Sequence, residues 1–311
     1  MRSTLLAALL SALVLALCAA PLHAQTIDDS IPPGANFDKA QFRLWLPHDA
    51  GALRAVLVLV PGSNGDGRAM AEDTVWQHFA AANKLAIVAC RFTDKPHDQN
   101  FIEEYVDVRR GSGQALLDML SRYALRTNHA EINTAPLLMW GMSAGGQFDY
   151  EMTAWKPERI AAFVANKGGI YYSALTPRAA RQVPGILFIG GKDLEQRIQT
   201  ITGLFAVNRR GGALWALAEE PGVAHVVGRS RDVSMVFFED VLAARLAADG
   251  TLKPLNEKSG WWGDPHTQAI GAFGALGAES MKLPNYPMAW LPTERVARAW
   301  RAMLTESPFE P

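Results

Sequence analysis

Six short apolar runs recur along the chain, each bounded by glycine, proline or charged residues. Nearly every position within them is apolar, whereas a strand with one solvent-facing side would alternate between apolar and polar residues. The pattern is therefore typical of strands that are buried on both faces of a sheet. The runs occupy residues 53–60, 84–90, 136–141, 159–166, 185–191 and 213–219.

Longer amphipathic segments separate these runs and predict helices. Strands that alternate with helices imply a mostly parallel, doubly wound sheet covered by helices on both faces, so we expect the α/β class. The run at 42–47 predicts one further, antiparallel strand at the start of this core. The expected helices span residues 68–83, 113–126, 147–155, 194–209 and 231–246.

Residues 249–311 break this alternation. They are rich in glycine, proline and aromatic residues, and a final amphipathic helix is predicted at 293–304. Four of the nine tryptophans lie here, an apolar load that would not stay in water. We therefore predict a core at 25–248 and a C-terminal extension packed on it, near the carboxyl ends of the strands.

The first 24 residues predict a secretory signal peptide. Arg2 precedes an apolar run at 5–20, and the segment ends on the small residue Ala24. Export to the periplasm or the extracellular space is the expectation. The run is short for a bilayer span and no basic flank follows it, so a membrane anchor is the weaker alternative. A lipoprotein modified at Cys18 is also less favoured, because the bulky Leu17 precedes that cysteine.

Composition narrows the possible classes of function. The 311 residues are 49% hydrophobic and 20% charged, which suits a large buried core. The net charge of −1 and the lack of basic clusters argue against a nucleic-acid partner. Outside the leader Cys90 is the one cysteine, expected to be buried rather than reactive. No Cys/His cluster has metal-ligand spacing, so we expect neither a metal nor an organic cofactor.

The stretch "LLMWGMSAGGQF" places Ser143 between small residues where a buried strand gives way to a helix. A surface turn with a helix-capping serine is one interpretation. The pattern G-x-S-x-G, here residues 141–145, is also that of a nucleophile elbow, in which a sharp turn exposes the serine at a helix N-terminus. The strand-to-helix context favours the elbow.

A serine nucleophile needs a base and an orienting acid. Asp193 follows a later apolar run in "GILFIGGKD", and His225 lies in the loop "EPGVAH" after the next run. Both positions are at or just beyond the carboxyl end of a predicted strand. Asp193 as a helix cap, with Glu195 as a weaker candidate acid, and His266 as a rival base remain alternatives.

The loop "VPGSNGDG" follows the first long buried strand. The backbone N–H groups of Ser63 in this loop and of Ala144 in the elbow are candidate donors to an oxyanion. A phosphate-binding interpretation is poor, because the loop lacks the G-K-[ST] ending of a P-loop and Asp66 would repel phosphate.

The sequence resembles the α/β-hydrolase superfamily, and within it the secreted feruloyl esterases and polyester depolymerases. The resemblance covers residues 42–246 and rests on "PGSNG", "GMSAGG", "FIGGKD" and "GVAH" in that order. It implies a triad of Ser143, Asp193 and His225 with an oxyanion hole at Ser63 and Ala144. One departure is Pro61, where relatives commonly carry a histidine.

The resulting hypothesis is a secreted serine hydrolase that cleaves carboxylic esters, small or polymeric, through an acyl-enzyme. A serine peptidase of the same fold and a non-catalytic binding protein remain the alternatives. Four aromatic residues are candidates for substrate binding, although the tryptophans could equally pack the extension against the core. These residues are Tyr171, Tyr172, Trp261 and Trp262.

Overall fold

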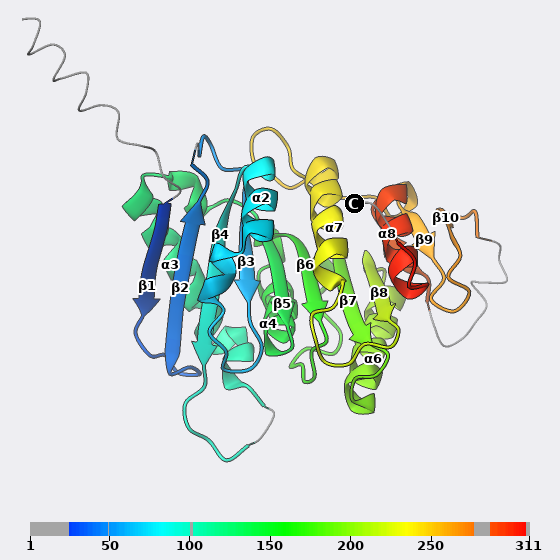
Figure 1. Cartoon of the computed structure of the whole chain (residues 1–311), viewed down its shortest axis with the longest axis horizontal. Helices are drawn as coiled ribbons and strands as arrows, with labels where there is room; N and C mark the ends of the chain where they lie inside the picture. The colour runs from blue at the N-terminus through cyan, green and yellow to red at the C-terminus, as the bar shows by residue number, and fades with distance from the viewer. Residues whose placement is uncertain (1–24, 49, 100–101, 277–286, 309–311) are drawn as a thin grey trace, which may run out of the picture.

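The computed structural model describes residues 25–48, 50–99, 102–276 and 287–308. Within these residues, eight strands form one sheet in the order β1-β2-β4-β3-β5-β6-β7-β8 (Figure 1). Strand β2 is antiparallel to both β1 and β4, and the remaining strands are parallel to one another. The strands are β1 (Gln25–Ile31), β2 (Lys39–Leu46), β3 (Ala55–Val60), β4 (Leu85–Thr93), β5 (Leu137–Met142), β6 (Ile160–Asn166), β7 (Gly185–Gly190) and β8 (Trp215–Glu220).

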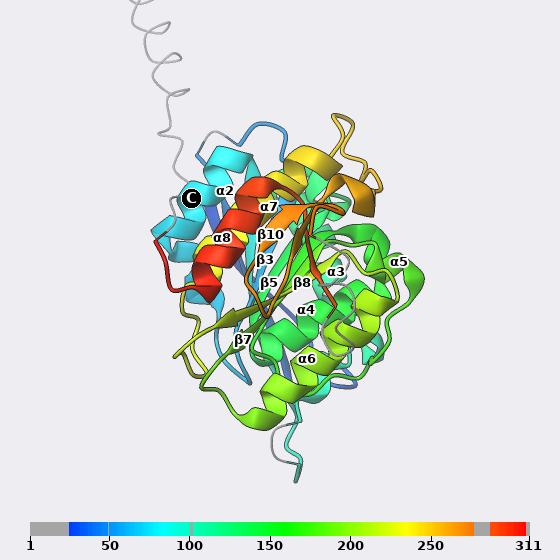
Figure 2. The same cartoon turned by 90° about the vertical axis from the view of Figure 1, so that its right-hand side faces the viewer.

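Helices cover both faces of this sheet. Figure 2 shows α2, α7 and α8 on one side and α3, α4 and α6 on the other. The α/β architecture predicted from the alternating pattern is thereby confirmed. The helices are α2 (Thr74–Asn83), α3 (Ser112–Thr127), α4 (Ala144–Trp155), α5 (Arg178–Arg181), α6 (Glu195–Arg210), α7 (Ser230–Arg245) and α8 (Glu294–Leu304).

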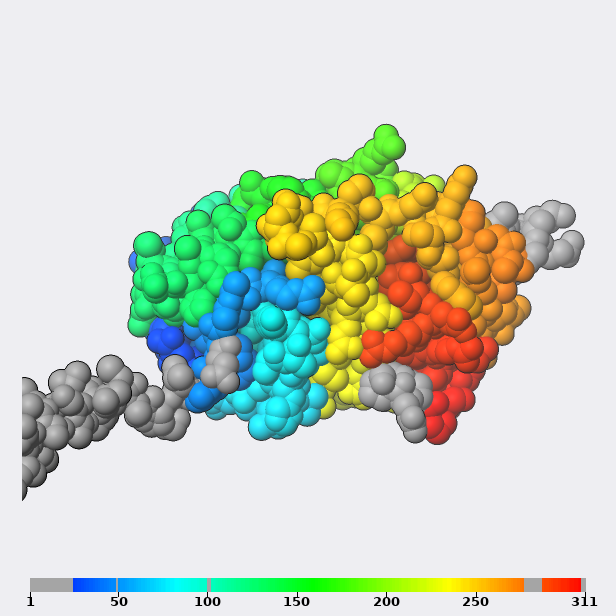
Figure 3. Space-filling view, turned by 90° about the horizontal axis from the view of Figure 1, so that it is seen from above, coloured from blue at the N-terminus to red at the C-terminus, as the bar shows by residue number. Residues whose placement is uncertain are grey.

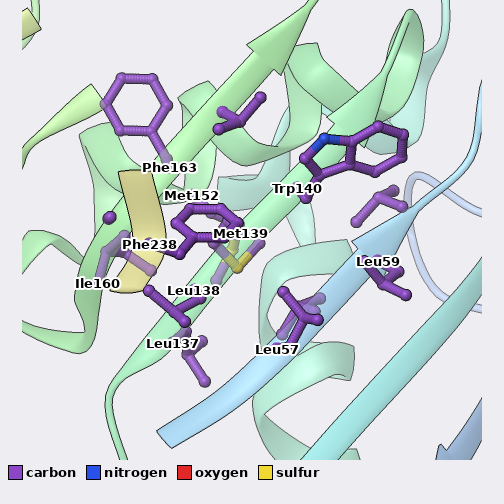
Figure 4. Packing of buried hydrophobic residues seen from close by; sticks show 14 of the residues in the cluster. Leu57, Leu59, Leu137, Leu138, Met139, Trp140, Met152, Ile160, Phe163 and Phe238 are labelled. Atoms are coloured by element: carbon purple, nitrogen blue, oxygen red, sulfur yellow. The ribbon is translucent and has the colours of Figure 1, made fainter. Parts of the chain in front are cut away.

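The central strands are buried along their whole length, as their continuous apolar runs predict. Because helices lie on both faces, alternate side chains of one strand all enter apolar surroundings. The ring of Trp215 illustrates the packing, since it meets Phe163 and Tyr150 edge-to-face at centroid distances of 5.3 and 5.6 Å. Figure 4 shows part of this core, with side chains of Leu57, Leu59, Leu137, Leu138, Met139, Trp140, Met152, Ile160, Phe163 and Phe238.

Two predicted helices begin elsewhere than expected. The segment 68–83 is divided into a 3₁₀ helix, η1 (Arg68–Glu72), and α2. Asp73 lies between them with extended backbone, and its side chain accepts hydrogen bonds from the N–H groups of Val75 and Trp76, which makes it the N-cap of α2. Helix α4 begins at Ala144 rather than at 147, because the turn at Ser143 leads directly into the helix.

Strand β1 was not predicted from the sequence. Its residues, QTIDDSI, lack an apolar run, because an edge strand pairs on one side only and exposes most of its side chains. The strand is held instead by polar contacts. Asp28 pairs with Arg43 at 2.6 Å, and the Tyr123 hydroxyl lies 3.1 Å from the carbonyl oxygen of Ile27.

The C-terminal segment lies along the β8 edge of the sheet. It forms a small sheet of β10 (Ile270–Ala272), β9 (Trp261–Gly263) and β11 (Ala289–Leu291), followed by α8. Helix α8 packs on α7 and β8, and the indole N–H of Trp300 donates to the Leu217 carbonyl at 2.7 Å. Figure 3 shows these residues, orange to red, gathered at one end of the molecule beside the yellow α7.

The packing of α8 predicts a large stability effect at Trp300, which is fully buried. We expect Trp300→Ala to reduce the free energy of unfolding by about 3–5 kcal/mol, because it leaves a cavity and an unpaired carbonyl. Urea unfolding followed by circular dichroism measures this loss. Arg298→Ala on the same helix is the matched control, since the Arg298 side chain is 65% exposed, and should change stability by less than about 0.5 kcal/mol. Equal losses for the two variants would contradict the packing account.

Candidate active site

Ser143 occupies a sharp turn between β5 and α4. Its backbone angles, φ 55° and ψ −122°, are ones that residues with a side chain rarely adopt. The surrounding backbone stabilises this conformation, because the Ser143 N–H donates to the Asn166 carbonyl at 2.7 Å and the Gln147 N–H donates to the Ser143 carbonyl at 3.1 Å. The serine side chain is thereby held at the carboxyl edge of the sheet.

Two glycines allow the turn to pack this closely. A Cβ atom at Gly145 would lie 2.1 Å from the carbonyl oxygen of Val60, and one at Gly141 would lie 2.2 Å from the backbone of Gly145. Backbone atoms cannot yield as a flexible side chain does. Any larger residue at either position would therefore push α4 away from β3 and β5.

The turn brings Ser143 together with the predicted base and acid. The Ser143 Oγ atom lies 2.9 Å from Nε2 of His225, and Nδ1 of the same ring lies 2.7 Å from Oδ2 of Asp193. Asp193 follows β7 and His225 follows β8, so all three side chains come from the carboxyl ends of parallel strands. This is where parallel sheets place their ligand sites.

The side chain of Asp193 is buried, and several groups donate hydrogen bonds to its carboxylate. Its Oδ1 atom accepts a hydrogen bond from the N–H of Leu194 at 2.7 Å and one from Nη1 of Arg197 at 3.2 Å. Burial alone would raise the pKa of Asp193, but these bonds and the one to His225 outweigh it and hold the pKa below its usual value. The carboxylate is therefore ionised at neutral pH. The backbone bond from Leu194 also shows that Asp193 contacts the start of α6 while it faces His225.

The loop after β3 lies against the nucleophile. A Cβ at Gly62 would be 3.6 Å from the Cβ of Ser143, so the two backbones are close. Asn64 stabilises the loop in a left-handed conformation, with φ 53°, while its side chain accepts from the Asp94 N–H at 2.7 Å. Ser63 borders the same cavity as Ser143. Ala144 is the first residue of α4, where backbone N–H groups lack partners within the helix.

A cavity of about 920 Å³ opens at Ser143. Its volume suits a drug-sized ligand. Aliphatic residues and a few polar side chains border it, and no aromatic residue does within the described part of the chain. The lining residues are Gly62, Ser63, Gly65, Ile102, Glu103, Met142, Ser143, Gln147, Gly169, Ile170, Leu194, Gln196, Arg197 and His225.

None of the four aromatic candidates borders this cavity in the described structure. Tyr171 is partly buried against the core, and its ring packs edge-to-face on Tyr150 at 4.9 Å. Tyr172 is 45% exposed and does not border the cavity. Trp261 and Trp262 lie in β9, beyond the β8 edge, where Trp262 packs against Phe273. The tryptophans thus serve the packing of the extension.

The other candidate residues from the sequence lie away from Ser143. His266 borders a separate cavity beside Ile189 and Leu217 rather than the one at Ser143. The Glu195 carboxylate accepts a hydrogen bond from Gln199 on the surface of α6. Cys90 is fully buried, and burial raises the pKa of its thiol. In the described residues, no group of three or more His, Cys, Asp or Glu side chains could hold a metal ion.

The sequence analysis missed a buried ion pair beneath the His225 loop. Nζ of Lys167, at the end of β6, lies 3.2 Å from Oε2 of Glu220, at the end of β8. The second carboxylate oxygen of Glu220 accepts from the Arg229 N–H at 2.7 Å. Burial lowers the pKa of Lys167, and the charge of Glu220 opposes this effect. Glu220 thus joins the two ends of the segment 221–229, which carries His225, and Lys167 links Glu220 to the end of β6.

No protein family model matches the sequence, and no curated protein matches it. Several solved structures resemble the chain in fold. One is the poly(aspartic acid) hydrolase-1 of Sphingomonas sp. KT-1, with 15% identity, a TM-score of 0.52, and coverage of 69% of this chain and 98% of the other. A ferulic acid esterase has 13% identity, a TM-score of 0.51, and coverage of 71% and 97%. Brefeldin A esterase has 12% identity, a TM-score of 0.50, and coverage of 71% and 78%.

Identities this low define a fold and not an activity. The strand order, with its antiparallel second strand, and these structural matches give the chain the α/β-hydrolase fold. This confirms the resemblance drawn from the sequence at the level of the fold. In the described part of the chain no helix is both long and apolar enough to cross a membrane. The predicted signal peptide, residues 1–24, lies outside the described residues.

The buried ion pair predicts a non-additive loss of stability. Lys167→Met leaves Glu220 buried without its cation, which we expect to cost about 3–5 kcal/mol of unfolding free energy. The double variant Lys167→Met, Glu220→Gln removes the unpaired charge and should recover at least about 1 kcal/mol of that loss. Urea unfolding of the wild type, both single variants and the double variant provides the cycle. If the double variant lost more unfolding free energy than the two single variants lose together, the result would contradict the pairing.

Proposed function

We propose that the protein is a serine hydrolase that cleaves carboxylic esters through Ser143, His225 and Asp193. One observation carries the proposal. A serine Oγ in a strained turn lies 2.9 Å from an imidazole nitrogen whose other nitrogen lies 2.7 Å from a buried carboxylate, beside a cavity of about 920 Å³. A helix cap or a structural hydrogen bond would require neither the strain nor the cavity.

The charge of Asp193 sets the proton positions at His225. An ionised carboxylate only accepts hydrogen bonds, so Nδ1 of His225 carries the proton and donates it to Oδ2 of Asp193. In the neutral ring Nε2 is then left as the acceptor, and it faces the Ser143 hydroxyl. The imidazole is therefore oriented as a general base toward the nucleophile.

Acylation follows from this geometry. Nε2 of His225 takes the Ser143 proton as Oγ attacks the ester carbonyl, and Asp193 stabilises the imidazolium that forms. The imidazolium then protonates the leaving alcohol, which departs and leaves an acyl group on Oγ. Water deprotonated by the same nitrogen attacks the acyl carbonyl, releases the acid and restores Ser143.

The tetrahedral intermediate needs donors for its oxyanion. We assign this role to the backbone N–H groups of Ser63 and Ala144. The Ser63 loop packs against Ser143, and Ala144 lies at the N-terminus of α4, where the helix dipole also favours negative charge. Loss of one such donor typically lowers turnover about 10²–10³-fold. Pro61, which stands where relatives commonly carry a histidine, lies in the same loop two residues before Ser63.

Two of the structural neighbours described above are esterases by name, which supports an ester substrate. The third is a hydrolase of poly(aspartic acid), whose backbone links are amides, so the choice of ester over amide rests on the two esterases. We further propose that the protein is exported, with residues 1–24 as the leader. Arg2, the apolar run at 5–20 and the small residue Ala24 support this proposal.

Ser143→Ala tests the nucleophile. We expect this variant to lose fluorophosphonate labelling, measured as an intact-mass adduct, and to lose about 10⁴-fold or more in turnover of a short acetyl ester. Its melting temperature should stay within a few degrees of the wild type, because the change removes one oxygen atom. Equal fluorophosphonate labelling of Ser143→Ala and the wild type would reject Ser143 as the nucleophile. Wild-type cleavage of matched amides faster than esters would favour a peptidase.

His225→Ala and His266→Ala test the base by comparison. Because His225 contacts the Ser143 hydroxyl and His266 borders a separate cavity, loss of His225 should lower kcat/KM for the acetyl ester about 10³-fold or more, whereas His266→Ala should leave kcat/KM within about twofold. Steady-state assays at one pH are sufficient for this comparison. A large loss of activity in His266→Ala, with activity retained in His225→Ala, would assign the role of the base to His266.

A further inference from the structure

Arg197 places a guanidinium on the wall of the cavity. It lies one helical turn beyond Asp193, and its side chain is 20% exposed. Nη1 is held by Oδ1 of Asp193 at 3.2 Å. Among the described residues, Nε and Nη2 donate to no protein group. These two nitrogens form the edge of the guanidinium that binds a carboxylate through two parallel hydrogen bonds.

Gln147 supplies a second donor on the same wall. Its Oε1 atom accepts from the Gly169 N–H at 2.8 Å, which fixes the orientation of the side-chain amide. In the described part of the chain, Nε2 of this amide has no protein partner, and Gln147 borders the cavity. The amide is thus held as a donor before any ligand arrives, which lowers the entropic cost of binding.

Gly169 brings the two donors together. A Cβ at this position would lie 3.3 Å from Nε of Arg197 and 3.7 Å from Oε1 of Gln147. Both side chains therefore pass against the same stretch of backbone. A polar wall of Gln147, Gly169 and Arg197 results, which we call the donor wall.

Glu103 also borders the cavity and carries the opposite charge. It comes from the segment before η2 (Glu104–Val106) and, among the described residues, forms no ion pair. The rest of the lining includes the aliphatic side chains of Ile102, Ile170 and Leu194. A bound anion would be attracted by Arg197 and repelled by Glu103, so the cavity has a defined polarity.

We infer that the cavity accepts esters that carry a carboxylate besides the reacting ester group, with that carboxylate bound by Arg197 and Gln147 of the donor wall. The inference rests on the proposed ester hydrolysis and names its substrate class. The contact of Nη1 with Asp193 offsets part of the charge of Arg197, but among the described residues Nε and Nη2 keep no protein partner. A carboxylate placed near Glu103 would instead be repelled.

Two substrates of equal length test this inference. Mono-4-nitrophenyl adipate carries a terminal carboxylate, and 4-nitrophenyl adipamate carries a neutral amide in its place, with the same leaving group. We expect the wild type to prefer the adipate by at least about tenfold in kcat/KM, since charge-assisted hydrogen bonds are about twice as strong as neutral ones. The preference should appear mainly in KM.

Variants at Arg197 and at Glu103 should move this preference in opposite directions. Arg197→Gln should reduce the adipate-to-adipamate ratio about tenfold or more, whereas Glu103→Gln should raise it several-fold by removing repulsion. The ratio corrects for any effect of Arg197 on Asp193, because both substrates use the same triad. A wild-type ratio at or below one, or a ratio unchanged by Arg197→Gln, would overturn the inference while leaving ester hydrolysis in place.

A binding measurement separates this inference from catalysis. Calorimetry on Ser143→Ala should show that monomethyl adipate binds at least about tenfold more tightly than methyl adipamate, and that Arg197→Gln in the same background removes the difference. Failure of the wild type to hydrolyse either nitrophenyl ester would contradict the proposed function. Equal binding of the two methyl esters would contradict the donor wall, whatever the activity.

Discussion

The close packing of the Ser143 turn on β3 is the constraint on which the site depends. Backbone atoms of Val60 and Gly145 approach so nearly that a single added carbon would lie 2.1 Å from an oxygen atom. This contact fixes where α4 begins, and hence where its free N–H groups point. It also holds Ser143 at φ 55°, a conformation maintained by its hydrogen bond to Asn166. The strain of one residue is offset by the packing of the buried central strands β3, β6 and β7.

The same sheet determines where the partners of Ser143 can be. Because β5, β7 and β8 are parallel, the loops that follow them open at one edge, and side chains distant in sequence meet there. The Lys167 and Glu220 pair beneath the His225 loop, and the donors around Asp193, hold the side chains of His225 and Asp193 in place through buried polar contacts.

Apolar runs, glycine spacing and the order of serine, acid and histidine along the chain were sufficient to predict the parallel strands and the three residues that meet at the site. Those signals are local, because a strand buried on both faces needs an unbroken apolar run and a tight turn needs glycine. Edge strand β1 has no such signal. Whether aromatic residues line the cavity was not predictable in this way, because lining residues are single positions in separate loops. Aromatic content singled out Tyr171 and Trp262, yet the fold packs the first, partly buried, against Tyr150 and places the second beyond β8.

The proposed mechanism requires that Ser143 becomes covalently acylated during turnover. Rapid quenching of the wild type with a 4-nitrophenyl ester, followed by peptide mapping, measures this directly. The proposed mechanism predicts a burst of nitrophenol of up to one equivalent per enzyme and an acyl mass on the peptide that contains Ser143. Ester turnover with the acyl group on another residue would contradict this mechanism.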